Sequence, residues 1–356
     1  YPKGGVTGGS IMSVSVSQHP GWPFSDSIQY KDVQAASGKT YYNENWGRGY
    51  TREAGVNDPS KIDEGANFQE QWDNAIEADP STVFVTGWNE WIAVKNFEDI
   101  TVTTGVPSRV GIPDRRVFFV DTFNEEFSRD IEPMKGGYGD NYYLQMIENI
   151  RAYKGYTDGE YAKGQKLTID TNGSVKQWEA VTSSFRDFVG DAVERNHVDA
   201  AGVSTYSDTS NRNDISEIRL TYDNDNIYIL VSTAENITAH EQGDLSWMNI
   251  LIGVDGSDAP AFENWQYIIN RTPGDGTTSV EKSLGGYSFE KIGDAQYSVN
   301  GKYLQVAIPK TLLGLGDNFT LEIKVTDHIT HPDDIMDYYV SGDSAPIGRF
   351  SYSWQV

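Results

Sequence analysis

The stretch VFVTGWNEW, residues 83–91, decides the fold predicted for the N-terminal part of the chain. It begins as a short apolar run, which is typical of a buried strand, and ends in a polar and aromatic segment. A helical pattern precedes it, with Phe68, Trp72, Ala75 and Ile76 spaced by three and four residues before Pro80. A helix followed by a buried strand is half of a parallel α/β unit. The stretch therefore predicts an α/β architecture.

A second stretch, VFFVDTFNEEF at residues 117–127, repeats the apolar run followed by Asn and Glu. A last helix is predicted from about Asp140, and Gly155 suits its C-terminal cap. We expect residues 1–156 to form the C-terminal part of a (β/α)8 TIM-type barrel. A whole barrel needs about 250 residues. The missing N-terminal barrel half is therefore expected upstream of Tyr1 or as a separate fragment.

The pattern becomes all-β in the C-terminal part of the chain. Residues 157–185 carry few apolar side chains and are interpreted as a connector. In residues 186–356, short alternating runs are separated by turn residues, which predicts an antiparallel β-sandwich. Strands are predicted around 218–222, 227–231, 249–254, 267–270, 303–308, 321–325 and 350–354.

Composition excludes several classes of partner. The chain holds 28 basic and 52 acidic residues, a formal net charge of −24. Such a surface repels a phosphate backbone, so no nucleic acid partner is expected. No apolar stretch of about 18 residues is present, so no membrane span is predicted. The chain has no cysteine, which excludes thiolate chemistry.

Glu90 and Glu126 are the candidate catalytic residues, because each follows an apolar strand. In α/β barrels the active site lies at the C-terminal ends of the strands. Glycoside hydrolysis needs two carboxylates that flank the scissile bond. The structural alternative is that each Glu caps a loop or pairs with an arginine such as Arg129.

Residues near these carboxylates are candidates for sugar binding. Aromatic rings stack on sugar C–H faces, and Asn, His and Arg hydrogen-bond hydroxyl groups. Core packing or loop bracing is the alternative for each of them. The predicted substrate-binding residues on this face are His19, Trp46, Arg48, Trp88, Asn89 and Trp91.

GWNEW, followed by DIEP and a helix rich in Tyr-Gly-x-x-Tyr, resembles the C-terminal end of barrels related to endo-α-mannosidases, glycoside hydrolase family 99. The resemblance covers roughly residues 10–156 and implies that Glu90 assists attack by the sugar's own 2-hydroxyl. The family's second Glu stands three positions later, where this chain has Ala93. Glu126, in FNEEFSRDIEPM, is the best substitute, and Asp130 and Glu132 are weaker candidates.

The C-terminal part resembles family 9-type carbohydrate-binding modules, on the motifs YSDTSNRNDI, IYILVSTAENIT, WMNILIGVD, WQYIINR and GDSAPIGRFSY. The resemblance implies a tryptophan clamp and calcium-braced loops. Trp247 and Trp265 are candidates for the clamp, although core packing is the better interpretation for both. Asp255 and Asp258 are spaced like calcium ligands, but Asp-Gly-Ser-Asp is also an ordinary turn. The metal site therefore stays unassigned.

Two functions follow from these observations. The first is a glycoside hydrolase that acts on a polysaccharide or glycan, with no cofactor needed for its chemistry and calcium in a structural role. The alternative is a non-catalytic glycan-binding protein with a degenerate barrel. A glycosyltransferase is disfavoured, because no nucleotide-sugar site is recognised in the sequence. The resemblances imply a secreted or cell-surface protein of a bacterium.

Overall fold

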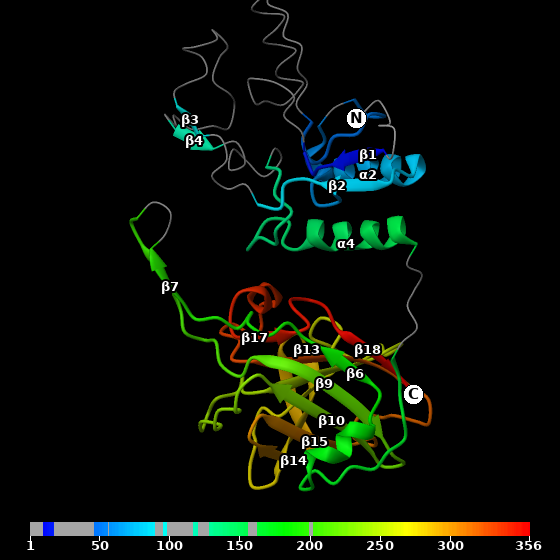
Figure 1. Cartoon of the computed structure of the whole chain (residues 1–356), viewed down its shortest axis with the longest axis vertical. Coiled ribbons are helices and arrows are strands. Elements are labelled where there is room, and N and C mark those ends of the chain that lie inside the picture. The colour runs from blue at the N-terminus through cyan, green and yellow to red at the C-terminus, as the bar shows by residue number, and fades with distance from the viewer. Residues whose placement is uncertain are drawn as a thin grey trace, which may run out of the picture. The chain divides into compact units, whose positions relative to one another are not determined.

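The computed structural model describes residues 10–17, 46–55, 57–89, 95–97, 117–119, 128–155, 162–198 and 202–356. The chain divides into two compact units, Tyr1–Asp158 and Gly159–Val356, whose elements are labelled in Figure 1. Within the described ranges, every helix is too short or too polar to cross a membrane.

The first unit contains a parallel pair of strands connected through a helix. β1 and β2 pair in parallel from Ile11 opposite Thr82 to Val14 opposite Val85, and α2 lies beside them in Figure 1. The elements of this unit are β1 (Ile11–Val14), the 3-10 turn η1 (Pro59–Lys61), α2 (Ala66–Ala78), β2 (Thr82–Val85), β3 (Lys95–Phe97), β4 (Val117–Phe119) and α4 (Asn141–Lys154).

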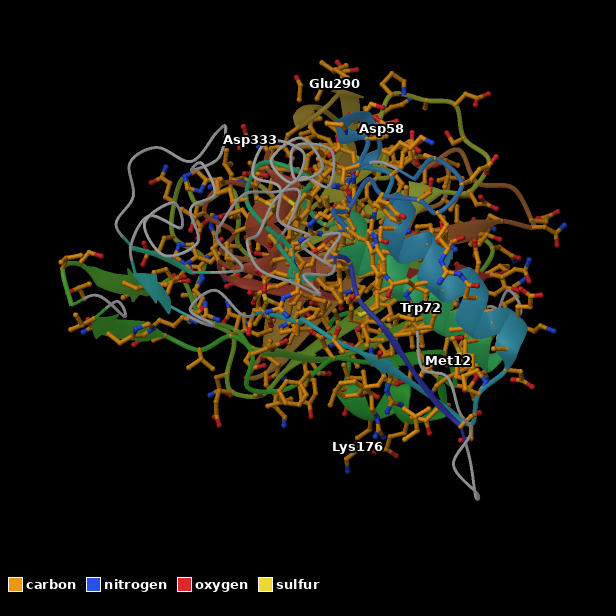
Figure 2. All side chains as sticks on the ribbon, turned by 90° about the horizontal axis from the view of Figure 1, so that it is seen from above. Met12, Asp58, Trp72, Lys176, Glu290 and Asp333 are labelled. Atoms are coloured by element: carbon orange, nitrogen blue, oxygen red, sulfur yellow. The ribbon has the colours of Figure 1, made fainter. Side chains whose placement is uncertain are left out.

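The core of the first unit lies between α2, α4 and one face of the parallel pair. Trp72 on α2 and Met12 on β1, both labelled in Figure 2, belong to this core. The two predicted helices are confirmed. The first, α2, buries Phe68, Trp72 and Ala75, and the second, α4, ends where Gly155 adopts a left-handed conformation with φ 69°.

The prediction of a partial (β/α)8 TIM-type barrel for residues 1–156 is wrong. Among the described residues of this unit, strands pair only two by two, and the second pair, β3 with β4, is antiparallel. The strand predicted at 117–120 is present as β4, but its partner is Lys95–Phe97, and no strand within the described ranges pairs with it in parallel. The spacing of apolar residues indicates which side chains face a core. It does not determine the direction of a strand or the strand with which it pairs.

The second unit is built around one large sheet, antiparallel except for the pair β5 and β18. Its strands follow the order β5-β18-β16-β11-β12-β13-β14-β15-β10-β9-β6, and β17 pairs with β16. A separate hairpin, β7 with β8, extends from this unit. The all-β prediction for this part is confirmed, and a sandwich is compatible with it, although the strands are joined in a single sheet.

The elements of the second unit are β5 (Ala162–Lys163), η3 (Val175–Ala180), β6 (Ser184–Arg186), β7 (Arg195–Val198), β8 (Thr205–Asp208), β9 (Ile215–Tyr222), β10 (Asn226–Thr233), β11 (Asn249–Val254), β12 (Tyr267–Ile269), β13 (Thr277–Gly285), β14 (Ser288–Asn300), β15 (Tyr303–Pro309), β16 (Thr320–Asp327), η4 (Ile335–Tyr339), β17 (Asp343–Ala345) and β18 (Tyr352–Gln355).

Residues 162–167 nearly close this sheet on itself. β5 pairs with β18 in parallel, and three residues later Lys166 bridges to Tyr222 of β9. β18 and β9 lie toward opposite ends of the strand order, so one short segment links the two edges. The stretch expected as a connector, 157–185, thus includes β5, η3 and most of β6.

Alternation along the strands separates an inner core from two outer layers. On β11, Ile250 and Ile252 face the inner cluster, whereas Leu251 joins an outer cluster with Tyr338 of η4. On β10, Tyr228 and Leu230 pack instead against Trp178 of η3. Successive side chains of a strand point to opposite faces of the sheet. A strand made of consecutive apolar residues, such as β10 or β11, therefore has other side chains packed on both of its faces.

Candidate functional site

The C-terminal ends of β1 and β2 meet at one edge of the first unit, because the two strands run parallel. A third segment, residues 128–132, is hydrogen-bonded to the residues that follow each of these two strands. Ser17 donates its hydroxyl to the carbonyl of Ser128 at 2.9 Å. The amide of Glu132 donates to the carbonyl of Trp88 at 2.9 Å. Residues 87–88 and the DIEP segment are therefore neighbours.

Gly87 permits this close approach. Its φ of 78° lies in the left-handed region, and a Cβ atom at this position would lie 2.3 Å from the carbonyl oxygen of Arg129. The amide of Ile131 donates to the carbonyl of Gly87 at 3.0 Å. Glycine is needed here both for its backbone conformation and for the space.

Exposed Trp88 and Asn89 lie beside half-buried Glu132 at this edge. The Asn89 amide Nδ2 donates to Glu132 Oε2 at 3.2 Å. Trp88 is 45% exposed and contacts Tyr143 of α4 edge to face, with ring centroids 5.6 Å apart. An aromatic face beside an amide and a carboxylate is the combination that binds sugar rings, since the ring stacks and the polar groups take hydroxyls.

Arg48, predicted on the sugar-binding face, is instead fully buried. Its guanidinium lies between the rings of Tyr138 and Tyr142, 4.1 and 4.2 Å from their centroids. Its Nη2 donates to the carbonyl of Asp130 at 2.7 Å, while Nε and Nη1 are enclosed and have no hydrogen-bond partner among the described residues. Burial raises the pKa of the Tyr142 hydroxyl, and the nearby guanidinium opposes that rise. Arg48 therefore supports the interior of this unit.

A buried polar layer lies beneath the edge. Gln71 of α2 accepts from the amide of Ser15 at 3.1 Å and donates to its carbonyl at 2.6 Å. Asn67 donates to the carbonyl of Val16 at 3.1 Å. These side chains hold the segment that follows β1, and sequence reasoning missed them because polar residues within an amphipathic helix suggest a solvent-facing position.

Trp46, also predicted in the site, stacks on Tyr50 with ring centroids 5.6 Å apart, and its indole nitrogen is enclosed. It is therefore a packing residue of the loop before α2. The other predicted site residues, His19, Glu90, Trp91 and Glu126, lie outside the described residues.

In the second unit, the two tryptophans considered for a sugar clamp are core residues. Trp247 is 2% exposed and donates its indole nitrogen to the carbonyl of Thr238, and Trp265 is fully buried. Their interpretation as core packing is confirmed. Asp255 and Asp258 lie in the exposed turn after β11, and within the described residues no third metal-binding side chain gathers with them.

No family model matches the chain, and no curated protein matches its sequence. The resemblances to endo-α-mannosidase-related barrels and to family 9-type carbohydrate-binding modules stay predictions.

Proposed function

We propose that this protein binds a polysaccharide or glycan outside the cell, at the edge of the first unit formed by Trp88, Asn89 and Glu132. The observation that carries the proposal is the hydrogen bond between Asn89 and Glu132 beside the exposed face of Trp88. The backbone bonds of residues 128–132 fix this pair in position. A sugar stacked on Trp88 would find an acceptor and a donor next to the ring.

Removal of the aromatic platform tests the proposal. We expect Trp88→Ala to weaken glycan binding by at least ~10-fold, since truncation of an aromatic anchor costs ~2 kcal/mol or more. Affinity electrophoresis against a panel of soluble polysaccharides measures the retention. Phe84→Ala is the matched control, because Phe84 on β2 is 61% exposed and belongs to the same unit. Equal retention of wild type and Trp88→Ala on every polysaccharide would refute the proposal.

Hydrolysis of the bound glycan is the second candidate function. It is favoured by the position of Glu132, whose carboxylate is hydrogen-bonded to Asn89, the residue immediately before Glu90. In this version Glu90 and Glu126 are the paired carboxylates, and Glu132 orients the Asn-Glu segment. Protonation of the leaving group and activation of the nucleophile require two such groups.

Glu90→Gln separates hydrolysis from binding. Gln keeps the shape of Glu but transfers no proton, so turnover should fall by ~10²–10⁴-fold while glycan retention is kept. The measurement is reducing-sugar release from the polysaccharide that the electrophoresis identifies, with melting curves as a folding control. Wild-type turnover in Glu90→Gln would remove its catalytic role, and absence of turnover in the wild type would leave the binding function alone.

A further inference from the structure

One buried arginine holds the segment that carries Glu132. The Nη2 atom of Arg48 donates to the carbonyl of Asp130 at 2.7 Å and to the hydroxyl of Ser128 at 3.3 Å. The Ser128 hydroxyl in turn donates to Asp130 Oδ2 at 3.1 Å. Residues 128–130 are therefore held from the interior of the first unit, two positions before Glu132.

Arg48 is fixed at both its backbone and its guanidinium. Its carbonyl accepts from the amide of Asn67, near the start of α2, at 3.0 Å. Its guanidinium lies between the rings of Tyr138 and Tyr142. A planar guanidinium stacks on aromatic faces, whereas the ammonium of a lysine is a compact point charge on a flexible stem. The donor atom Nη2 therefore has a defined position beside residues 128–130.

The packing of the core does not by itself require an arginine at this position. Arg48 is 0% exposed, and its Nε and Nη1 have no hydrogen-bond partner among the described residues. Moving a cation out of water is costly, and apolar side chains of similar volume often replace buried charged groups without loss of stability. The feature that an apolar side chain would lack is the pair of directed hydrogen bonds from Nη2 to residues 128–130.

The held segment continues directly into the glycan edge, which is the surface formed by Trp88, Asn89 and Glu132. The amides of Ile131 and Glu132 both donate to the carbonyl of Trp88, at 3.1 and 2.9 Å. Glu132 Oε2 accepts from the side chain of Asn89 at 3.2 Å. Since only Ile131 separates Asp130 from Glu132, a shift of the Asp130 carbonyl would move this carboxylate relative to the Trp88 ring.

We propose that Arg48 is a positioning residue of the glycan edge. By holding the carbonyl of Asp130, it places the carboxylate of Glu132 beside Asn89 and the Trp88 ring, where a sugar hydroxyl would find its acceptor. Arg48 is buried and does not contact the glycan, so it acts through Glu132. This inference rests on the proposed glycan-binding function and adds to it a residue that sets the geometry of the same site.

A double-mutant cycle between Arg48 and Glu132 tests the positioning role on the full chain. Titration calorimetry measures the affinity for the best-retained glycan, at a temperature at which melting curves show each variant to be folded. Arg48→Lys should weaken binding ~10-fold when Glu132 is present, because it removes hydrogen bonds from a charged donor. In a Glu132→Ala background, Arg48→Lys should weaken binding less than ~2-fold further. A purely structural role would give the same loss in both backgrounds.

Ser128→Ala is a milder change that keeps the test decisive if Arg48→Lys does not fold. It removes the hydroxyl that accepts from Arg48, and it too should weaken binding only when Glu132 is present. Arg52→Lys is the matched control, because Arg52 lies in the same loop before α2 and pairs with Glu70, 3.9 Å away. This control should keep the wild-type affinity.

Two results would overturn the positioning role alone. One is wild-type affinity in both Arg48→Lys and Ser128→Ala, and the other is a loss of equal size with and without the Glu132 carboxylate. Either result would leave the proposed function in place as long as Trp88→Ala still weakens binding. Absence of glycan binding by the wild type would instead remove the proposed function, and the positioning role with it.

Discussion

Single residues explain why part of the predicted site lies at the surface and part does not. Trp88 and Arg48 both lie in Gly-containing segments, and both were predicted to bind sugar because they were expected on the same face of a barrel. The structure exposes Trp88 and buries Arg48 between Tyr138 and Tyr142. The Tyr-x-x-x-Tyr spacing was visible in the sequence. It could not reveal that an arginine about 90 positions earlier lies between the two rings.

Gly87 is the residue on which the contact between residues 87–88 and 128–132 depends most. Gly87→Ala should destabilise the first unit by ~2 kcal/mol or more beyond the cost of a left-handed alanine, because its Cβ would collide with the carbonyl of Arg129. Gly55→Ala is the matched control, since Gly55 has φ 65° and no atom near its would-be Cβ. Urea unfolding of both variants measures the difference. Equal losses of stability would contradict the account of this contact.

At the level of elements, local pattern predicted structure well wherever one face is strongly apolar. The helices α2 and α4 and the strands β10 and β11 match their predicted positions closely. The long hairpin of β13 and β14 was missed, because Val280 and Ala295 are its only buried members of the inner core, and Ile292 and Tyr297 pack against that core while partly exposed. Pairing was less predictable, since β4 pairs antiparallel with a three-residue partner that has no marked apolar pattern.

We predict that the second unit needs residues 162–186 to fold cooperatively. The piece 159–356 should unfold in one cooperative transition, whereas the piece 187–356 should not. The shorter piece lacks β5, η3 and β6, and with them Trp178, which is 1% exposed and donates to Gln305 at 2.7 Å. Loss of a buried tryptophan alone costs ~3–5 kcal/mol. Circular dichroism melting compares the two pieces, and equal cooperativity would show that the segment is dispensable.

For the whole molecule, composition and fold lead to one consistent proposal. The net charge of −24 disfavours polyanionic partners, and a neutral glycan avoids that repulsion. The α/β pattern predicted for residues 1–156 is present in one part of that range, since β1 and β2 pair in parallel and α2 lies between them in the sequence. The extension of that pattern to a TIM-type barrel failed, because a single parallel unit does not determine how many strands follow it.

The central claim is that residues 87–89 and 128–132 form one glycan-binding edge. Calorimetric titration with the best-retained glycan tests it most directly, on the wild type, Asn89→Ala, Glu132→Gln and the double variant. Because the two side chains share a hydrogen bond, each single change should weaken binding by ~10-fold, and the double change little more than either one. Wild-type affinity in both single variants would contradict the claim, and so would fully additive losses in the double variant.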